Sequence, residues 1–224
     1  MGRQEASVVV HKNQDVVYKA LSHPWKYHYY VDRQCSLSFA DSRLHSYLME
    51  MFESCPHDKF LDGPRSSALK IDPQIELIPV KHHEVCSFAQ RGLMWGMQGT
   101  AHGNVQLFML QHDSGTIGVE VPIWLDDEEY EKLGFSFDDK GPLSGHIDVL
   151  RVENGLIWIW DFKPKAHREK FAHAQVMVYA MMLSYRTGIP LSEFRCGYFD
   201  ENISYVFEPR SSPLASALIS IQGK

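Results

Sequence analysis

The sequence predicts an α/β or α+β fold with a central mixed β-sheet flanked by helices. Three observations support this: strand patterns dominate after residue 115, a helix pattern follows Pro164, and two short strand patterns follow that helix. With 224 residues, of which 44% are hydrophobic and 22% charged, the chain can bury a sizeable core. This composition is that of a globular protein rather than a disordered or fibrous one.

The first 110 residues are expected to form mainly helices and loops, including a helix over residues 42–53 that ends before Pro56. We expect residues 1–80 to be a helical N-terminal lobe packed on a core of residues 81–224. No internal repeat, low-complexity tract or long linker separates two independent domains.

A β-branched, apolar run over residues 116–124 has turn residues on both sides and predicts a strand. Two further strands are predicted at residues 145–152 and 156–163. They are joined by Asn154-Gly155, a dipeptide that is the strongest short signal for a β-hairpin.

After this hairpin the pattern changes to a helix over about residues 168–186, because proline interrupts a strand ladder and Gly188 can end a helix. Short strands are predicted near residues 194–199 and 203–208. A last helix is predicted over residues 212–221, where Pro213 suits a first turn.

Bulk features exclude several classes of protein. No window approaches the ~18 apolar residues of a membrane span, and the N-terminus lacks a signal-peptide pattern. We therefore expect an intracellular protein, cytoplasmic or with the nucleoid, with no membrane partner. The net charge of -6 gives no global attraction for nucleic acid, so any basic groove must be local.

The four cysteines are scattered without a C-x-x-C pair, which predicts neither a zinc ribbon nor a disulfide framework and suits a reducing compartment. They are Cys35, Cys55, Cys86 and Cys196.

The predicted hairpin brings two aspartates together. If Asn154-Gly155 forms a two-residue turn, counting outward along the ladder places Asp148 opposite Asp161. Opposed like charges, roughly 4.5–5.5 Å apart at Cβ, destabilise a sheet unless something compensates them, and a divalent cation is the obvious compensator. A three-residue loop through Glu153 would instead pair Asp161 with Ile147 and separate the aspartates.

Lys163 is two residues beyond Asp161 and therefore projects from the same face of the strand. Two carboxylates and an ammonium near a metal ion suit phosphodiester hydrolysis, since the ion activates water while the lysine stabilises charge. The alternative is that these are solvated strand charges. The opposite face would pack the side chains of Trp158, Trp160 and Phe162.

The tripeptide D-x-K is weak evidence alone, because Asp138-Asp139-Lys140 matches it too. That copy is surrounded by polar and glycine residues, as in a solvated loop. The copy at Asp161-Phe162-Lys163 ends a hydrophobic strand, which is the rarer arrangement.

These residues resemble the RecB-like branch of the PD-(D/E)XK nucleases. Gly145-His146-Ile147-Asp148, Trp160-Asp161-Phe162-Lys163 and Gln175-Val176-Met177-Val178-Tyr179 match its G-x-x-D, D-x-K and Q-x-x-x-Y motifs in order. Upstream, Gly99-Thr100-Ala101-His102 resembles its G-x-x-H helix motif, and Glu120-Val121-Pro122 is similar to its E-x-P strand. The resemblance covers roughly residues 82–208 and implies a restriction-endonuclease-like core.

The resemblance implies that His102, Asp148 and Asp161 ligate Mg²⁺ or Mn²⁺, with the Phe162 backbone carbonyl as a further oxygen ligand. Glu120 is an additional or indirect ligand by the same resemblance. The mixed ligand set is sensible, because imidazole favours Mn²⁺ over Mg²⁺ and carboxylates accept both. The alternative for His102 is an ordinary surface or core histidine, and the alternative for Glu120 is an exposed strand carboxylate.

Lys163 would be the catalytic lysine. Gln175 and Tyr179 share one helix face by their spacing, and the resemblance implies that they orient the lysine or contact substrate. The alternative is an amphipathic core face shared with Phe171, Val178 and Met182.

Two groups of residues are candidates for DNA contact. The first is a basic cluster that would hold the phosphate backbone, or else a solvated helix start: Lys165, Arg168 and Lys170, with His167 and His173. The second is an aromatic group that would stack on single-stranded bases, or else pack in the core: Trp25, Tyr27, Tyr29 and Tyr30.

Together these features predict a Mg²⁺- or Mn²⁺-dependent deoxyribonuclease, an exonuclease acting on DNA ends or single strands in repair, recombination or replication. The alternatives are a nuclease-fold accessory protein that binds DNA without cutting, and a metal-dependent hydrolase of another phosphoester. Several RecB-like exonucleases carry an iron–sulfur cluster on clustered C-terminal cysteines. Only Cys196 lies late in this chain, so we predict no cluster.

Overall fold

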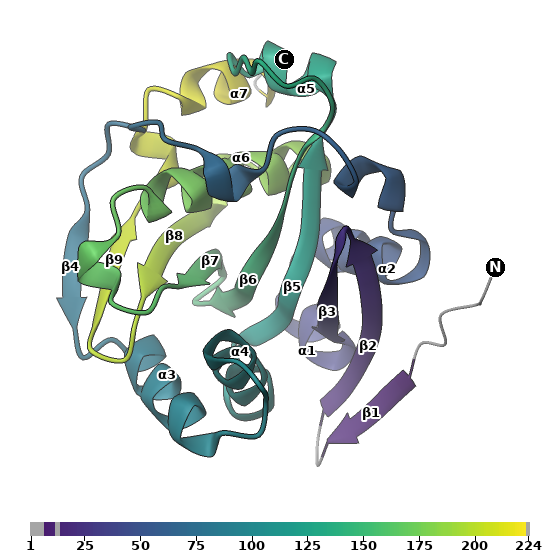
Figure 1. The fold of residues 1–224 in the computed structure, drawn as a ribbon, viewed down its shortest axis with the longest axis vertical. Helices are drawn as coiled ribbons and strands as arrows, with labels where there is room; N and C mark the ends of the chain where they lie inside the picture. Colours follow the sequence, from purple (N-terminus) through teal and green to yellow (C-terminus); the bar gives the residue numbers. More distant parts are fainter. Residues whose placement is uncertain (1–6, 12–13, 223–224) are drawn as a thin grey trace.

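A mixed, mostly antiparallel sheet runs through the computed structural model, which describes residues 7–11 and 14–222 (Figure 1). Within this range the sheet has nine strands in the order β1-β2-β3-β5-β6-β7-β8-β9-β4. Neighbouring strands are antiparallel except for β7 and β8, which are parallel. The strands are β1 (Ser7–His11), β2 (Gln14–His23), β3 (Trp25–Asp32), β4 (Ile78–Lys81), β5 (Thr116–Leu125), β6 (Leu143–Glu153), β7 (Leu156–Phe162), β8 (Phe194–Phe199) and β9 (Ile203–Phe207).

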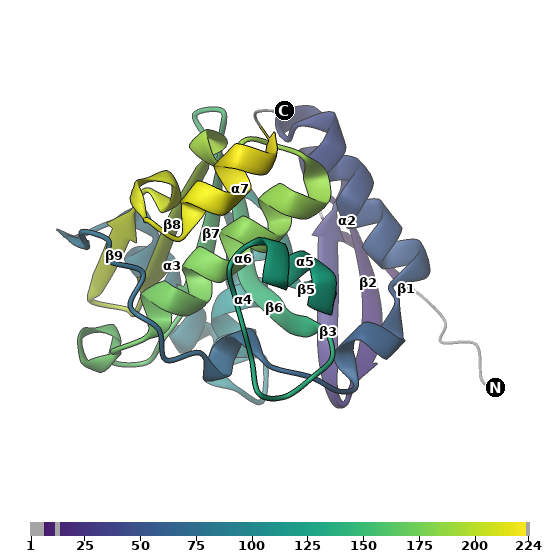
Figure 2. The same ribbon diagram turned by 90° about the horizontal axis from the view of Figure 1, so that it is seen from above.

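Helices cover both faces of this sheet, as the sequence predicts. Helices α2 and α6 pack on one face, with α7 against α6 (Figure 2), and α3 and α4 pack on the other. No helix in the described part of the chain is long and apolar enough to cross a membrane. The helices are α1 (Arg33–Phe39), α2 (Ser42–Ser54), α3 (Glu84–Trp95), α4 (Ala101–His112), α5 (Asp127–Lys132), α6 (Ala172–Thr187) and α7 (Ala215–Gln222).

The N-terminal segment differs from its prediction. Helix α2 confirms the helix expected over residues 42–53, but the residues described before α1 are strands rather than helices and loops. Strand β3 pairs with β5 at Tyr30–Val119 and Val31–Gly118, so this segment extends the sheet. The helical N-terminal lobe is therefore wrong for this stretch; residues 1–6, 12–13 and 223–224 lie outside the described residues.

The elements predicted from residue 116 onward are present with small shifts at their ends. The largest shift is at α6, which begins at Ala172 rather than near residue 168. Lys165 has a left-handed φ of 65°, which is incompatible with a helix, and a short 3₁₀ turn follows it. The buried Asp200 carboxylate holds this loop by accepting a hydrogen bond of 2.8 Å from the Ala166 amide.

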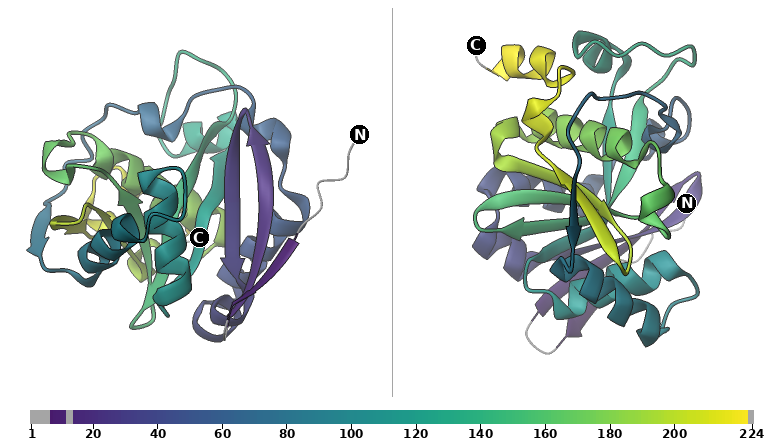
Figure 3. Two further views of the ribbon diagram at one scale, coloured as in Figure 1. Left: turned by 60° about the horizontal axis from the view of Figure 1, so that its bottom comes forward. Right: turned by 90° about the vertical axis from the view of Figure 1, so that its left-hand side faces the viewer.

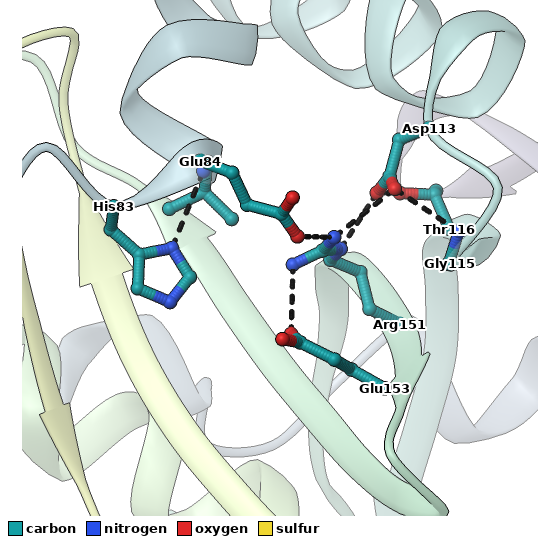
Figure 4. Close-up of polar contacts among 8 residues, drawn as sticks. His83, Glu84, Asp113, Gly115, Thr116, Arg151 and Glu153 are labelled. Atoms are coloured by element: carbon teal, nitrogen blue, oxygen red, sulfur yellow. Dashed lines mark hydrogen bonds and ion pairs between the residues drawn. The ribbon is translucent and has the colours of Figure 1, made fainter.

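A buried arginine attaches α3 and α4 to the sheet (Figure 4). Arg151 of β6 donates to both carboxylate oxygens of Asp113, the residue that follows α4, at 2.6 and 3.1 Å. It also pairs with Glu84, the first residue of α3, and with Glu153 on its own strand. Because buried charges are costly unless paired, this network fixes α4 relative to β6.

Candidate active site

The β6–β7 hairpin has the register that brings the two aspartates together. Asn154 and Gly155 have φ values of 51° and 77°, as a two-residue I′ turn requires, and Glu153 pairs with Leu156. The paired residues run from there to Val149–Trp160, where the ladder ends, and one further step of the same count sets Asp148 opposite Asp161. The Asp148 side chain reaches across to β7 and accepts a hydrogen bond from the Phe162 amide. The alternative three-residue loop is excluded.

Lys163 lies against the second aspartate. Its Nζ is 2.7 Å from Asp161 Oδ2 and 3.1 Å from Gln175 Oε1. Asp161 Oδ2 accepts no well-directed hydrogen bond among the described residues, so its contact with the ammonium is an ion pair. Asp161 is only 1% exposed whereas Lys163 is 22% exposed, which places the lysine at the mouth of the site.

Helix α6 supports this lysine from one face of the sheet. Gln175 Nε2 donates to Tyr179 Oη at 2.9 Å, so the amide oxygen of Gln175 is turned toward Lys163. Both residues are buried and contribute to packing as well as to the polar chain. The α6 face that carries Gln175 and Tyr179 therefore both packs in the core and contacts the lysine.

The glycine of the G-x-x-D motif has a packing role. A Cβ atom on Gly145 would lie 2.5 Å from the Tyr179 ring, closer than any side chain can approach. Tyr179 therefore needs a glycine beneath it. The G-x-x-D and Q-x-x-x-Y motifs are thus in direct contact.

Glu120 joins the cluster through an irregularity in β5. Its φ of 52° is left-handed, and its neighbours Val119 and Val121 pack into cores on opposite faces, although residues two apart in a regular strand share a face. Gln106 of α4 holds the Glu120 carboxylate with a hydrogen bond of 2.7 Å. Such strained backbone is concentrated at functional sites.

His102 approaches from the first turn of α4. Its Nε2 is 3.9 Å from Asp148 Oδ2, and its ring packs edge-on against Phe162 at 5.2 Å between centroids. Its side chain is 43% exposed, so it is neither a core histidine nor a remote surface one. The Thr100 hydroxyl caps this helix by accepting from the Gly103 amide.

The cluster holds more negative charge than the chain compensates. Burial, and then the neighbouring charge of Glu120, raises the pKa of Asp148 to about 7. Burial and Asp148 raise the pKa of Asp161 to about 7, and burial followed by the Asp161 charge raises the pKa of Glu120 to about 7. Burial alone would lower the pKa of Lys163, but Asp161 and Asp148 outweigh it and raise that pKa.

Three carboxylates therefore share one ammonium, and either protons or a further cation must supply the missing positive charge. The available donors are carboxylate oxygens, the Phe162 carbonyl and the His102 imidazole, a set that suits Mn²⁺ or Mg²⁺. As they lie, no three His, Cys, Asp or Glu side chains of the described residues form a complete metal site. An ion would have to draw these donors together.

The predicted basic cluster and the second D-x-K match lie on exposed loops outside this cluster. The predicted phosphate-binding side chains Lys165, Arg168 and Lys170 are exposed on the loop between β7 and α6. The second D-x-K match, at Asp138-Asp139-Lys140, is an exposed loop, as expected. Of the aromatic group, Tyr29 is buried in the core, whereas Trp25 is 75% exposed.

A pocket of about 390 Å³ opens beside the carboxylates, between β3, the start of α4, and β5. Tyr27 and Tyr30 line one wall, His102 and Gln106 line the other, and Glu120 lies in its lining on β5. Two features of this region were not predicted: the Gln106–Glu120 hydrogen bond and the pocket itself. The i, i+4 spacing of His102 and Gln106 puts both residues on one face of the helix, and this was the sequence signal for the Gln106–Glu120 hydrogen bond.

Comparison with family models, with curated proteins and with solved structures finds no match to this chain.

Proposed function

We propose that this protein is a Mg²⁺- or Mn²⁺-dependent deoxyribonuclease with a PD-(D/E)XK, restriction-endonuclease-like core. The observation that carries the proposal is the β6–β7 hairpin, which sets Asp148 opposite Asp161 and places Lys163 2.7 Å from Asp161. This combination of paired carboxylates and a held ammonium suits attack of water on a phosphodiester.

The residues that would hold the ion are Asp148, Asp161 and His102, with the Phe162 carbonyl and Glu120 as further oxygen donors. When bound, the ion lowers the pKa of a water molecule and polarises the phosphate. Asp148 is fixed for this task because it accepts a hydrogen bond of 3.0 Å from the Phe162 amide. His102 is oriented by the edge-on packing of its ring against Phe162.

Lys163 supplies positive charge to the phosphate as negative charge grows on its oxygens. Its raised pKa keeps the ammonium protonated at neutral pH, and Gln175 limits where the Nζ atom can lie. The lysine is therefore an electrostatic group with a fixed position rather than a mobile surface charge. Lys165, Arg168 and Lys170 follow it in sequence and would contact the DNA backbone near the cut.

The preference for ends or single strands is part of the proposal and follows from the resemblance to exonucleases. The direct test is digestion of end-labelled linear and circular DNA, single- and double-stranded, with Mn²⁺, Mg²⁺ or EDTA. Lys163→Ala should lower cutting by about 10²–10³-fold, as loss of a group that stabilises the transition state does.

The matched control is Lys140→Ala, which removes the lysine of the exposed second D-x-K match and should leave cutting unchanged. Survival of circular DNA would mark an exonuclease. Tight DNA binding without cutting under every metal condition would favour the accessory-protein alternative. Cutting that persists in EDTA or in Lys163→Ala would overturn the proposed site.

A further inference from the structure

The pocket between β3 and α4 has features that the cutting reaction alone does not explain. It shares His102 and Glu120 with the carboxylate cluster, so anything bound in it lies next to the proposed cutting site. In the left view of Figure 3, helix α4 and the β2–β3 hairpin stand on either side of β5. A volume of about 390 Å³ lies within the usual range for small-ligand sites, roughly 300–1,000 Å³.

Its β3 wall is an ordered aromatic surface. Tyr18 of β2 packs against Tyr30 with ring centroids 4.8 Å apart, and it stacks on His28 at 5.7 Å. The Tyr18 hydroxyl and His28 Nδ1 are 2.9 Å apart, which fixes the two rings relative to each other. Rings held in this way bind a flat partner with little loss of side-chain freedom.

The charges around the pocket suit a nucleotide. Lys26 lines it, is exposed, and makes no ion pair within 4 Å among the described residues. Burial, and then Lys26, lowers the pKa of His28, and this ring is exposed in the pocket lining, where it offers a stacking face. The pocket lining therefore combines a lysine that makes no ion pair among the described residues with aromatic rings, and it places the Glu120 carboxylate on the side of the proposed cutting site.

We infer that this pocket binds an unpaired nucleotide of single-stranded DNA beside the phosphate that is cut. A base stacks on the wall formed by Tyr30 and His28, and Lys26 pairs with its phosphate. Unpaired bases are required, because a base within a duplex has both faces covered by its neighbours. The inference rests on the proposed function and adds to it the pocket that holds an unpaired base next to the cut.

Stacking should dominate the affinity, since the protein carries a net charge of -6 and the pocket holds one free lysine. For single strands, each phosphate that is neutralised contributes a slope of about -0.7 to the plot of log affinity against log salt. We therefore expect a shallow slope of about -1. A steep slope would indicate a charged groove elsewhere.

The test is fluorescence anisotropy with a labelled ten-residue oligothymidylate and a duplex of equal length, both in EDTA so that binding is measured without cutting. The single strand should bind at least 10-fold more tightly than the duplex. Tyr30→Ala should weaken its binding by about 10-fold or more, as loss of one base–aromatic stack does, and Tyr30→Phe should retain it.

Tyr30 is half-buried, so a second variant guards against a folding defect. Lys26→Gln changes an exposed side chain and should weaken binding a few-fold while reducing the salt slope by about 0.7. The matched controls are Lys140→Gln and Tyr205→Ala, which change an exposed loop and a strand near the opposite edge of the sheet and should leave binding unchanged.

Failure of this inference is distinguishable from failure of the nuclease proposal. Equal binding of the single strand and the duplex, or unchanged binding in both Tyr30→Ala and Lys26→Gln, overturns the pocket even if DNA is cut. Single-strand binding that depends on Tyr30 and Lys26 supports the pocket even if no metal supports cutting.

Discussion

At the scale of single residues, the main feature is a shortage of positive charge. The buried Asp161 and the half-buried Asp148 and Glu120 lie close together with the Lys163 ammonium, and the pKa of each carboxyl is raised to about 7. In a metal-free protein at pH 8 these carboxyls ionise although burial and the neighbouring negative charges disfavour their charged forms. The site is thus destabilising in itself, as preorganised sites often are.

This predicts that Asp148→Asn stabilises the metal-free protein at pH 8. A carboxyl whose pKa is raised on folding contributes stability below its unfolded pKa of about 4, and that contribution is lost as pH rises through about 7. The amide does not titrate, so the variant should gain about 2 kcal/mol at pH 8 and almost nothing at pH 4.5. Urea denaturation in EDTA at both pH values measures the difference.

Added Mn²⁺ should reverse the order, because the ion stabilises the wild-type protein by about 2.7 kcal/mol at a hundred times its dissociation constant and the variant by less. A variant that is less stable than the wild type at pH 8 in EDTA would contradict the charge-excess account.

A second prediction concerns Gln175, which holds the Lys163 ammonium at 3.1 Å. Gln175→Met keeps the volume of this buried side chain but removes its polar end. For the proposed nuclease, kcat should fall about 10-fold with little change in KM, since in that proposal only the transition state uses the position of the lysine. The double variant with Lys163→Ala should be no slower than Lys163→Ala alone, and additive losses would show that Gln175 acts independently.

At the scale of elements, the site depends on how helices are attached to the sheet. Helix α4 carries His102 and Gln106, and Arg151 ties the end of this helix to β6 through Asp113. Arg151 is 2% exposed and Asp113 5%, so neither charge can be solvated if the other is lost.

Arg151→Met should therefore lower the free energy of unfolding by about 3–5 kcal/mol, because it leaves the buried Asp113 carboxylate without its charged partner. Adding Asp113→Asn should recover part of the loss. The exposed Arg43–Asp41 pair is the control, since Arg43→Met should cost less than about 1 kcal/mol. Chemical denaturation measures all four proteins, and equal costs for the two arginine variants would rule out the buried network as a major anchor.

Elements fixed by local sequence were predictable. The Asn154-Gly155 turn sets the hairpin register, and the register alone places Asp148 opposite Asp161. The start of α6 was not predictable, because it depends on Asp200, which lies 34 residues beyond the amide that it holds. The left-handed backbone of Glu120 could not be predicted either, since its hydrogen-bond partner Gln106 lies on a different element.

At the scale of the whole molecule, distant segments meet through buried histidines. His23 of β2 lies 2.9 Å from His146 of β6 through one ring nitrogen and 2.9 Å from His57 through the other. Burial, and then His57, lowers the pKa of His23 to about 3, and burial and His23 lower the pKa of His146. In this row of histidines, the His23 ring stacks on Phe60 and the His146 ring stacks on Tyr27.

This arrangement predicts acid sensitivity. A histidine whose pKa is lowered on folding contributes stability above its unfolded pKa of about 6.5, and that stability is lost as pH falls toward 3. His23→Gln removes one such group, so the loss of stability between pH 8 and pH 5 should be smaller than in the wild type by about 2 kcal/mol. Thermal or urea unfolding of both proteins at the two pH values measures the difference. An equal loss of stability in the wild type and in His23→Gln would contradict the prediction.

The N-terminal strands show what sequence patterns leave out at this scale. Tyr27, Tyr29 and Val31 alternate along β3 and pack against one core, which is a strand signal. The residues that alternate with them, Lys26, His28 and Tyr30, and Pro24 at the reversal before β3, obscured it. The pocket beside the site could not be predicted, because it forms only where β3 meets β5, nearly ninety residues later.

The contact between Gly145 and Tyr179 has a consequence for inheritance. A side chain at position 145 and a ring at position 179 exclude each other, and Gly197 has the same relation to Trp160, whose ring lies 2.4 Å from where a Cβ atom would be. A library randomised at 145 and 179 together should yield folded proteins with a small residue at one position whenever the other is large. The two motif positions would then change as a pair through descent, and a glycine at 145 would mark lineages that keep the tyrosine.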